Sequence, residues 1–396
     1  MGSTLSTTLR TILIIAFYFQ ANITGMMGIN INIIIYILLG LCGFEYITKR
    51  RNYRNIPGTL ILLGIFILLL YRLYMNIFLG AFISAMYIAL PALILYITPQ
   101  QGKLGENSKV WLWNFIVTFY LIECGIAIFE FATHHYLFGY SESTYGDGKW
   151  HFTSRTADFR AVSICGSPLH NALIVTTINA FILFSSSSNR KKIICFVLGL
   201  LAVFAFNARI SVVLFILTGV LYGVREFRQR GGSYKIGLLL VASVIVILVL
   251  VSVTYLGLGS RLLAIDTESD SSIAVRLQLF EYFASASLKD YLWGGPMDNL
   301  GSEKDYIGVP IIENFWIEYL ILFGLIPLLY FASCYFYLGK KLFNGYKPYN
   351  KFVLSTVFIV NASINNSLST SYSPLLIFLL CTVAFKHREE VKLIKN

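Results

Sequence analysis

Apolar runs of about 20 residues, the length that a helix needs to cross a bilayer, recur along the whole chain. Hydrophobic residues make up 57 % of the sequence and charged residues only 13 %, whereas a soluble domain carries about 25 % charged residues. The pattern predicts an all-α polytopic membrane protein with about twelve transmembrane helices in a single transmembrane domain, residues 1–396. The candidate spans are roughly 9–27, 29–47, 58–76, 80–98, 111–131, 168–188, 193–208, 210–224, 236–257, 312–338, 352–366 and 371–385.

Basic clusters between the runs indicate the orientation, because short cytoplasmic loops carry an excess of lysine and arginine. With the N-terminus inside, 22 of the 31 lysine and arginine residues fall on the cytoplasmic side. Both termini are therefore expected in the cytoplasm. The net charge of +11 then reflects topology, and no nucleic-acid partner is expected. The basic connections are 1–10, 48–57, 99–110, 189–192, 225–235, 339–351 and 386–396.

Nine basic residues fall on the opposite side, and six of them are arginine. The planar guanidinium matches phosphate oxygens and stays charged, so these positions indicate an anionic ligand at the external face. The alternative is that they are solvated loop charges. The nine are Arg72, Lys149, Arg155, Arg160, Arg209, Arg261, Arg276, Lys289 and Lys304.

Two external connections, 133–167 and 258–311, are much longer than the others. Loops of this length in a compact domain are usually functional or disordered, and their aromatic content argues against disorder. Within the second loop, residues 273–292 have apolar positions at helical spacing and predict an amphipathic helix that ends at Gly294-Gly295-Pro296. Its apolar face carries Ile273, Leu277, Phe280 and Ala284.

Arg209 separates two apolar runs with almost no loop between them, where a charge is costly unless it meets a partner or a cavity. The alternative is a hairpin tip in water. Arg160 lies shortly before the span that begins at Pro168, and Arg276 lies on the predicted amphipathic helix. Three arginines from three segments are thus candidates to converge on one anionic group.

Glu313 stands at the external start of a span, where a carboxylate can act as a general base. The alternative is a carboxylate favoured by the positive end of the helix dipole. Glu123 and Glu130 lie within an earlier span and are candidates to pair with Arg72 or Arg209, a choice that the sequence leaves open.

Metal and cofactor chemistry is not indicated. His134, His135 and His151 share the first long loop, but adjacent histidines rarely bind one ion and the spacing of a metal site is absent. The six cysteines form no CxxC pair, and no nucleotide-binding or hydrolase motif is present. We expect neither a metal nor another cofactor.

The order of several short motifs resembles the O-antigen polymerase and ligase superfamily (Wzy-type polymerases and WaaL-type ligases). Arg160 precedes GSPLHNA at 166–172, and NARIS follows at 207–211. The long second loop carries VRLQLFEY and WGGP, and the next span opens with ENFWIEY and continues with GLIP. The likeness covers roughly residues 150–330.

The resemblance implies a C-type glycosyltransferase fold in the bacterial inner membrane, with the active face on the periplasmic or external side. It implies a metal-independent enzyme acting on undecaprenyl pyrophosphate-linked oligosaccharide, with the bilayer and a chain-length regulator protein as further candidate partners. Arginines of the family hold the pyrophosphate. Our hypothesis names Glu313, Arg209 and Arg276 as catalytic, and, as substrate-binding residues, Arg160, Arg155, His170, Asn171 and Asn314.

Three functions are compatible with this pattern. We favour a polymerase of O-antigen or capsular polysaccharide. The first alternative is a ligase that transfers glycan to the lipid A core, but ligases commonly carry a His-Asn pair where this chain has Glu313-Asn314. The second is a lipid-linked oligosaccharide flippase, although no internal repeat links the two halves of the chain.

Overall fold

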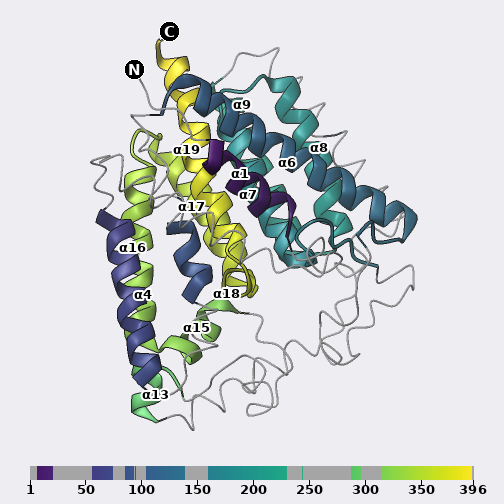
Figure 1. The fold of residues 1–396 in the computed structure, drawn as a ribbon. Coiled ribbons are helices and arrows are strands. Elements are labelled where there is room, and N and C mark those ends of the chain that lie inside the picture. Colours follow the sequence, from purple (N-terminus) through teal and green to yellow (C-terminus); the bar gives the residue numbers. More distant parts are fainter. Residues whose placement is uncertain are drawn as a thin grey trace.

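A computed structural model describes residues 7–20, 56–74, 85–92, 94, 104–138, 159–229, 243, 287–295 and 314–394. All elements labelled in Figure 1 are helices, which agrees with the predicted all-α class. Residues 85–92 form a further unlabelled helix. The labelled helices are α1 (Thr7–Tyr18), α4 (Ile56–Tyr74), α6 (Glu106–Thr133), α7 (Pro168–Phe184), α8 (Asn189–Ala205), α9 (Arg209–Gln229), α13 (Leu288–Trp293), α15 (Phe315–Phe323), α16 (Leu325–Leu342), α17 (Pro348–Ser363), α18 (Ser367–Thr370) and α19 (Ser373–Ile394).

Three of these helices are long and apolar enough to cross a membrane: Pro57–Tyr74, Glu106–Thr133 and Arg209–Gln229. Shorter apolar helices cover Thr7–Tyr18, Pro168–Phe184 and Ser373–Lys386. The predicted spans at 29–47 and 236–257 lie outside the described residues, apart from Ser243, so the count of twelve stays a prediction.

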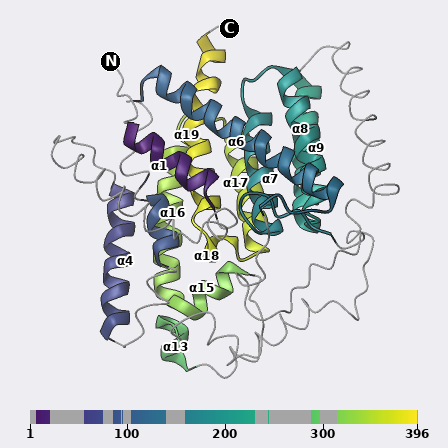
Figure 2. The same ribbon diagram turned by 45° about the vertical axis from the view of Figure 1, so that its right-hand side comes forward.

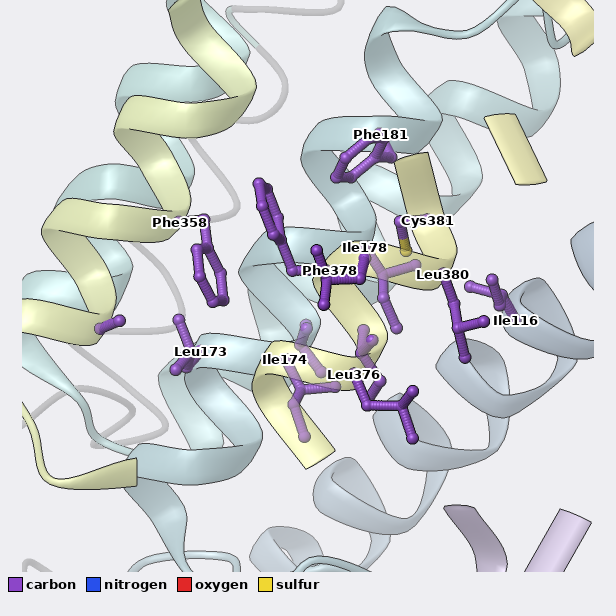
Figure 3. Close-up of a cluster of buried hydrophobic side chains, with 14 of the residues drawn as sticks. Ile116, Leu173, Ile174, Ile178, Phe181, Phe358, Leu376, Phe378, Leu380 and Cys381 are labelled. Carbon is purple, nitrogen blue, oxygen red and sulfur yellow. The ribbon is translucent and has the colours of Figure 1, made fainter. Parts of the chain in front are cut away.

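Helix α7 forms the centre of the bundle and packs against α6, α8, α9, α17 and α19. Nearly all of its side chains are buried, as expected for a helix that is apolar all round and has neighbours on every side. Figure 3 shows part of this core, where Leu173 and Ile174 lie among side chains of the neighbouring helices. The rings of Phe358 on α17 and Phe378 on α19 stack there, with centroids 4.1 Å apart.

Glycines let the helices around α7 approach closely. A Cβ added at Gly199 on α8 would overlap Tyr120 Oη of α6 and would lie 2.8 Å from the Phe215 ring of α9. The Tyr120 hydroxyl donates to the Cys195 carbonyl at 2.6 Å, which ties α6 to α8 one turn away. Small residues are favoured at contacts between apolar helices because they allow close backbone approach.

Four of the segments that the charge pattern assigns to one side are brought together in two pairs at one end of the bundle (Figure 1). The Arg10 guanidinium of α1 lies 5.2 Å from the Trp111 ring near the start of α6, and Arg225 Nη1 of α9 donates to Asn350 Oδ1 of α17 at 2.9 Å. We call this the basic end. The other, which we call the loop end, holds α13, α18 and the starts of α7, α9 and α15 (Figures 1 and 2). That the basic end faces the cytoplasm stays a prediction.

The predicted span at 312–338 is not one continuous helix, because the chain breaks at Gly324 into α15 and α16. Gly324 has φ +82°, a conformation that side chains with a Cβ rarely adopt, and the helix cannot continue through it. Helix α15 therefore turns away from the axis of α16 at the loop end (Figures 1 and 2).

Little of the predicted amphipathic helix at 273–292 lies in the described ranges. Its final part is α13, which begins after Ser287, whose Oγ accepts the Asp290 amide at 3.2 Å as an N-cap. It ends at Gly294 (φ +85°), as the sequence predicts. The proposed apolar face, from Ile273 to Ala284, is outside the described residues.

We predict that Gly199→Val lowers the melting temperature of the detergent-solubilised protein. The new side chain would overlap Tyr120 and Phe215, and overpacking a well-filled core costs about 1–3 kcal/mol. Gly223→Val on α9 is the matched control, because no atom lies within 4 Å of its added Cβ. Equal melting temperatures for the two variants would show that the α8 crossing is not as close as the structure has it.

Candidate functional site

The segment before α7, residues 159–167, is held against the turn between α8 and α9 at the loop end. The Ala161 amide donates to the Ala205 carbonyl at 3.0 Å, and Arg160 Nε donates to the Phe206 carbonyl at 3.1 Å. Phe159 is buried, and its ring lies 5.1 Å from Tyr136 in a stacked arrangement. The backbone and the neighbouring ring therefore fix the position of the half-buried Arg160.

Glu130 of α6 is hydrogen-bonded to the same segment. Its carboxylate accepts the amides of Val162 and Ser163, both at 2.9 Å, and that of Leu137 at 3.0 Å. Ser163 has φ +42°, an uncommon conformation for a residue other than glycine, so two of these charge-assisted bonds hold a strained turn and the third ties it to Leu137. The sequence left open whether Glu130 pairs with Arg72 or with Arg209. In the structure its carboxylate accepts hydrogen bonds from backbone amides, a role that the sequence pattern did not predict.

Tyr136 lies close to both charges of this region. Burial raises the pKa of Tyr136 to about 12, Glu130 adds to the rise, and Arg160 opposes it. The phenol therefore stays protonated and neutral at physiological pH. It is an unsuitable general base, although it can donate a hydrogen bond.

The turn between α8 and α9 accepts the hydrogen bond of Arg160 at Phe206 and leads directly into Arg209. Asn207 adopts a left-handed conformation (φ +51°), which asparagine tolerates better than most residues, and lets the chain reverse within three residues. Arg209 is then the first residue of α9 and is half-buried. A cation at a helix N-terminus opposes the helix dipole at a cost of about 0.3–1 kcal/mol, so stability alone does not favour arginine there.

The start of α15 is tied to the start of α9 through α17. Ser211 Oγ donates to Asn361 Oδ1 at 2.8 Å, and Asn365 Nδ2 donates to the Asn361 carbonyl at 3.0 Å. The Phe315 amide in turn donates to the Asn365 carbonyl at 3.2 Å. This chain of hydrogen bonds links the neighbourhood of Arg209 to the helix that follows Glu313.

Asn314 acts as the N-cap of α15. Its Oδ1 accepts the Trp316 amide at 2.9 Å and the Ile317 amide at 3.3 Å, two of the donors that a helix start leaves unpaired. Three other predicted site residues, namely Glu313, Arg155 and Arg276, lie outside the described residues, so their placement stays a prediction.

His170 and Asn171 are buried at the start of α7. His170 Nε2 lies 3.0 Å from Ser373 Oγ of α19, and Ser373 Oγ donates to Gln20 Oε1, just beyond α1, at 3.0 Å. Asn171 Nδ2 donates to the Val162 carbonyl and so holds the segment that carries Arg160. Both residues thus contact neighbouring segments of the protein, and their predicted role in substrate binding stays a prediction.

Residues 361–373 run from the last turn of α17 through α18 to the first residue of α19. The sequence analysis assigned them to the ends of two predicted spans and the short connection between these spans, and it predicted no site residue there. We call this segment the polar hub. It contains Asn361, Asn365 and Ser373, whose hydrogen bonds are described above. In addition, its Ser363 Oγ accepts a hydrogen bond from Trp316 Nε1 at 2.8 Å, and its Leu368 carbonyl accepts one from the Tyr319 hydroxyl at 2.5 Å. Ser369 Oγ donates to the buried Glu318. The signal was present as a dense run of asparagine and serine between two apolar spans.

In the parts of the chain that the structure describes, no three histidine, cysteine, aspartate or glutamate residues come together as a metal site. The arrangement is instead one of arginines, amides and hydroxyls, which suits the binding of phosphate and sugar oxygens. No protein-family model matches the chain, and no curated protein matches it.

We predict that Glu130→Gln loosens the segment at 159–167 and lowers thermal stability. The amide group that replaces one carboxylate oxygen cannot accept a hydrogen bond, and an unpaired buried N–H costs about 1–3 kcal/mol. Glu106→Gln, at the exposed start of the same helix, is the control. A melting temperature of Glu130→Gln equal to that of Glu106→Gln would contradict the role assigned to Glu130.

Proposed function

We propose that the protein is an O-antigen or capsular polysaccharide polymerase of a bacterial inner membrane, with about twelve spans, a C-type glycosyltransferase-like fold and its working face outside. The observation that supports the proposal is the hydrogen bond from Arg160 to the turn that immediately precedes Arg209 at the loop end. Arg160 binds the carbonyl of Phe206, three residues before Arg209, and hydrogen bonds connect this turn to the start of α15.

The reaction needs few protein groups because undecaprenyl pyrophosphate is already a good leaving group. The bond between the anomeric carbon of the growing glycan and the phosphate oxygen breaks, and the electron pair leaves with the pyrophosphate. Arg160, Arg209 and Arg276 neutralise the charge that develops on its oxygens, the kind of fixed electrostatic stabilisation that contributes most to many enzymes.

The acceptor is a sugar hydroxyl of the next lipid-linked repeat unit. Its oxygen attacks the anomeric carbon and forms the new glycosidic bond, while its proton passes to the Glu313 carboxylate as general base. The growing chain is thereby moved to the new unit, and undecaprenyl pyrophosphate is released. In this scheme neither a metal nor a nucleotide takes part.

Fixed positions favour this chemistry over transport. Arg160 and Arg209 are attached to a rigid turn at one end of the helices, and the segment before α7 is held by Glu130 and Asn171. Alternating access instead places substrate charges near the bilayer midplane between moving repeats. A preorganised external site is what group transfer needs.

We predict that Arg209→Ala and Glu313→Gln each shorten or abolish the polymer ladder of a strain that depends on this chain, whereas Arg228→Ala leaves it unchanged. Arg228 is the matched control because it lies on the same helix, exposed at the basic end. Removing one preorganised electrostatic group typically costs 10²–10³-fold in rate. Gel electrophoresis of the extracted polysaccharide gives the readout.

The same experiment separates the alternatives. Loss of a polymerase leaves single capped repeat units on the gel, whereas loss of a ligase leaves long chains on the lipid carrier. Purified protein that joins lipid-linked repeat units in detergent, without an ion gradient, supports the polymerase over a flippase. An unchanged ladder with Arg209→Ala and Arg276→Ala would refute the assignment of the pyrophosphate site.

A further inference from the structure

Arg72 of α4 is a charged side chain buried in a helix that is otherwise apolar, with only 1 % of its surface exposed. Its Nη1 donates to the Gly295 carbonyl at 2.9 Å, and its Nη2 donates to the carbonyls of Trp293 (3.1 Å) and Leu322. One guanidinium thus joins α4 to two segments, the turn that ends α13 within the second long connection and the end of α15.

The contacts of Arg72 complete the hydrogen bonding of the C-terminal end of α15. The last carbonyls of a helix lack partners within it, and in an apolar bundle the protein itself must supply them. The Gly324 amide binds the Leu320 carbonyl at 2.9 Å, the Gly295 amide binds that of Ile321 at 3.0 Å, and Arg72 binds that of Leu322. The positive charge is also favourable at the negative end of the helix dipole.

Two glycines make this junction possible. A Cβ on Gly294 would overlap Arg72 Nη2 and lie 2.6 Å from the Leu322 carbonyl oxygen. A Cβ on Gly324 would overlap the backbone nitrogens of Trp293 and Gly294. Both glycines have positive φ, so the two backbones touch at a point where no other residue fits well.

Helix α4 is itself fixed, which makes Arg72 a stationary anchor. The Tyr330 hydroxyl of α16 donates to the Leu60 carbonyl at 2.7 Å, and Gly64 provides the space for the Tyr330 ring. Near Arg72, the rings of Tyr71 and Trp293 lie 5.8 Å apart. Figures 1 and 2 both show α4 alongside α16, with α13 and α15 at its loop end.

We propose that Arg72 is a positioning residue: by holding the end of α15, it sets the orientation of this short helix and so the position of its first residues, which closely follow the proposed base Glu313 in the sequence. The proposal rests on the function proposed above. Helix α15 has nine residues and is only about 13 Å long, so a tilt at its end moves its start. The start itself is held by the Asn314 cap and by Asn365.

The kinetic test compares Arg72→Gln, Arg72→Lys and Gly294→Ala with the control Leu73→Ala, whose side chain is exposed on the same helix. Misplacing the base by about 1 Å costs on the order of 100-fold, so kcat is expected to fall about 10- to 100-fold in Arg72→Gln and Gly294→Ala. KM for the lipid-linked donor should stay within a few-fold, because the three carbonyls that Arg72 binds do not belong to the segments that carry Arg160 and Arg209. Arg72→Lys should recover part of the activity. A rise in KM at constant kcat, or no change, overturns the proposal.

A second readout does not depend on the proposed reaction. Amide hydrogen exchange is compared between the wild type and Arg72→Gln for peptides covering 293–295, 315–318 and 320–325, with α7 as the internal reference. Faster exchange, by about tenfold or more, at both the junction and the start of α15 supports the positioning role, even if the purified chain transfers no sugar. Faster exchange at the junction alone, or at neither site, shows that Arg72 does not position the start of α15.

Discussion

Hydrogen bonds of the polar hub decide how the loop end is built. In an apolar bundle the ends of helices cannot rely on water, so their polar groups need partners within the protein. In the hub, Asn361 accepts a hydrogen bond from Ser211 of α9, and the Asn365 carbonyl accepts one from the Phe315 amide of α15. Ser373 is hydrogen-bonded both to His170 of α7 and to Gln20, just beyond α1. Without these contacts, four helices would end at the same place with unpaired groups.

The same constraint explains why three of the charged residues toward the loop end bind backbone groups. Glu130 accepts three amides, Arg160 donates to the carbonyl of Phe206, and Arg72 donates to three carbonyls. Such bonds satisfy turns and helix ends that would otherwise be costly to bury. They also hold the proposed site in place, since each segment near Arg160 and Arg209 makes more than one hydrogen bond to its neighbours. A rigid arrangement of cations suits the stabilisation of a departing pyrophosphate.

Sequence patterns predicted the helices well where long apolar runs are flanked by basic residues. The runs at 58–76, 111–131 and 168–188 correspond to α4, α6 and α7, and four of the basic segments meet in two pairs at one end. The break at Gly324 was missed because the residues around it are as apolar as a continuous span. Hydropathy reports what a segment is solvated by and carries no information about its backbone conformation.

The proposed site could be foreseen only in part. The excess of arginine outside the basic clusters pointed to Arg160 and Arg209, since a charge beside an apolar run needs a reason. The local sequence could not show whether Glu130 would bind backbone amides or an arginine, because a carboxylate accepts hydrogen bonds from amides and guanidinium groups alike. Arg72 belonged to the same set of nine basic residues, yet the structure assigns it to a helix junction.

By itself, the sequence determined the helical class and the approximate course of the long apolar helices, because these depend on local hydropathy. Only the tertiary structure decided which polar groups meet. Gly294 and Gly324 are 30 positions apart, and Arg72 is more than 200 positions from both of its partner segments. Contacts at such separations arise from how helices pack, and this packing turns one arginine into a helix anchor and leaves another beside the proposed pyrophosphate site.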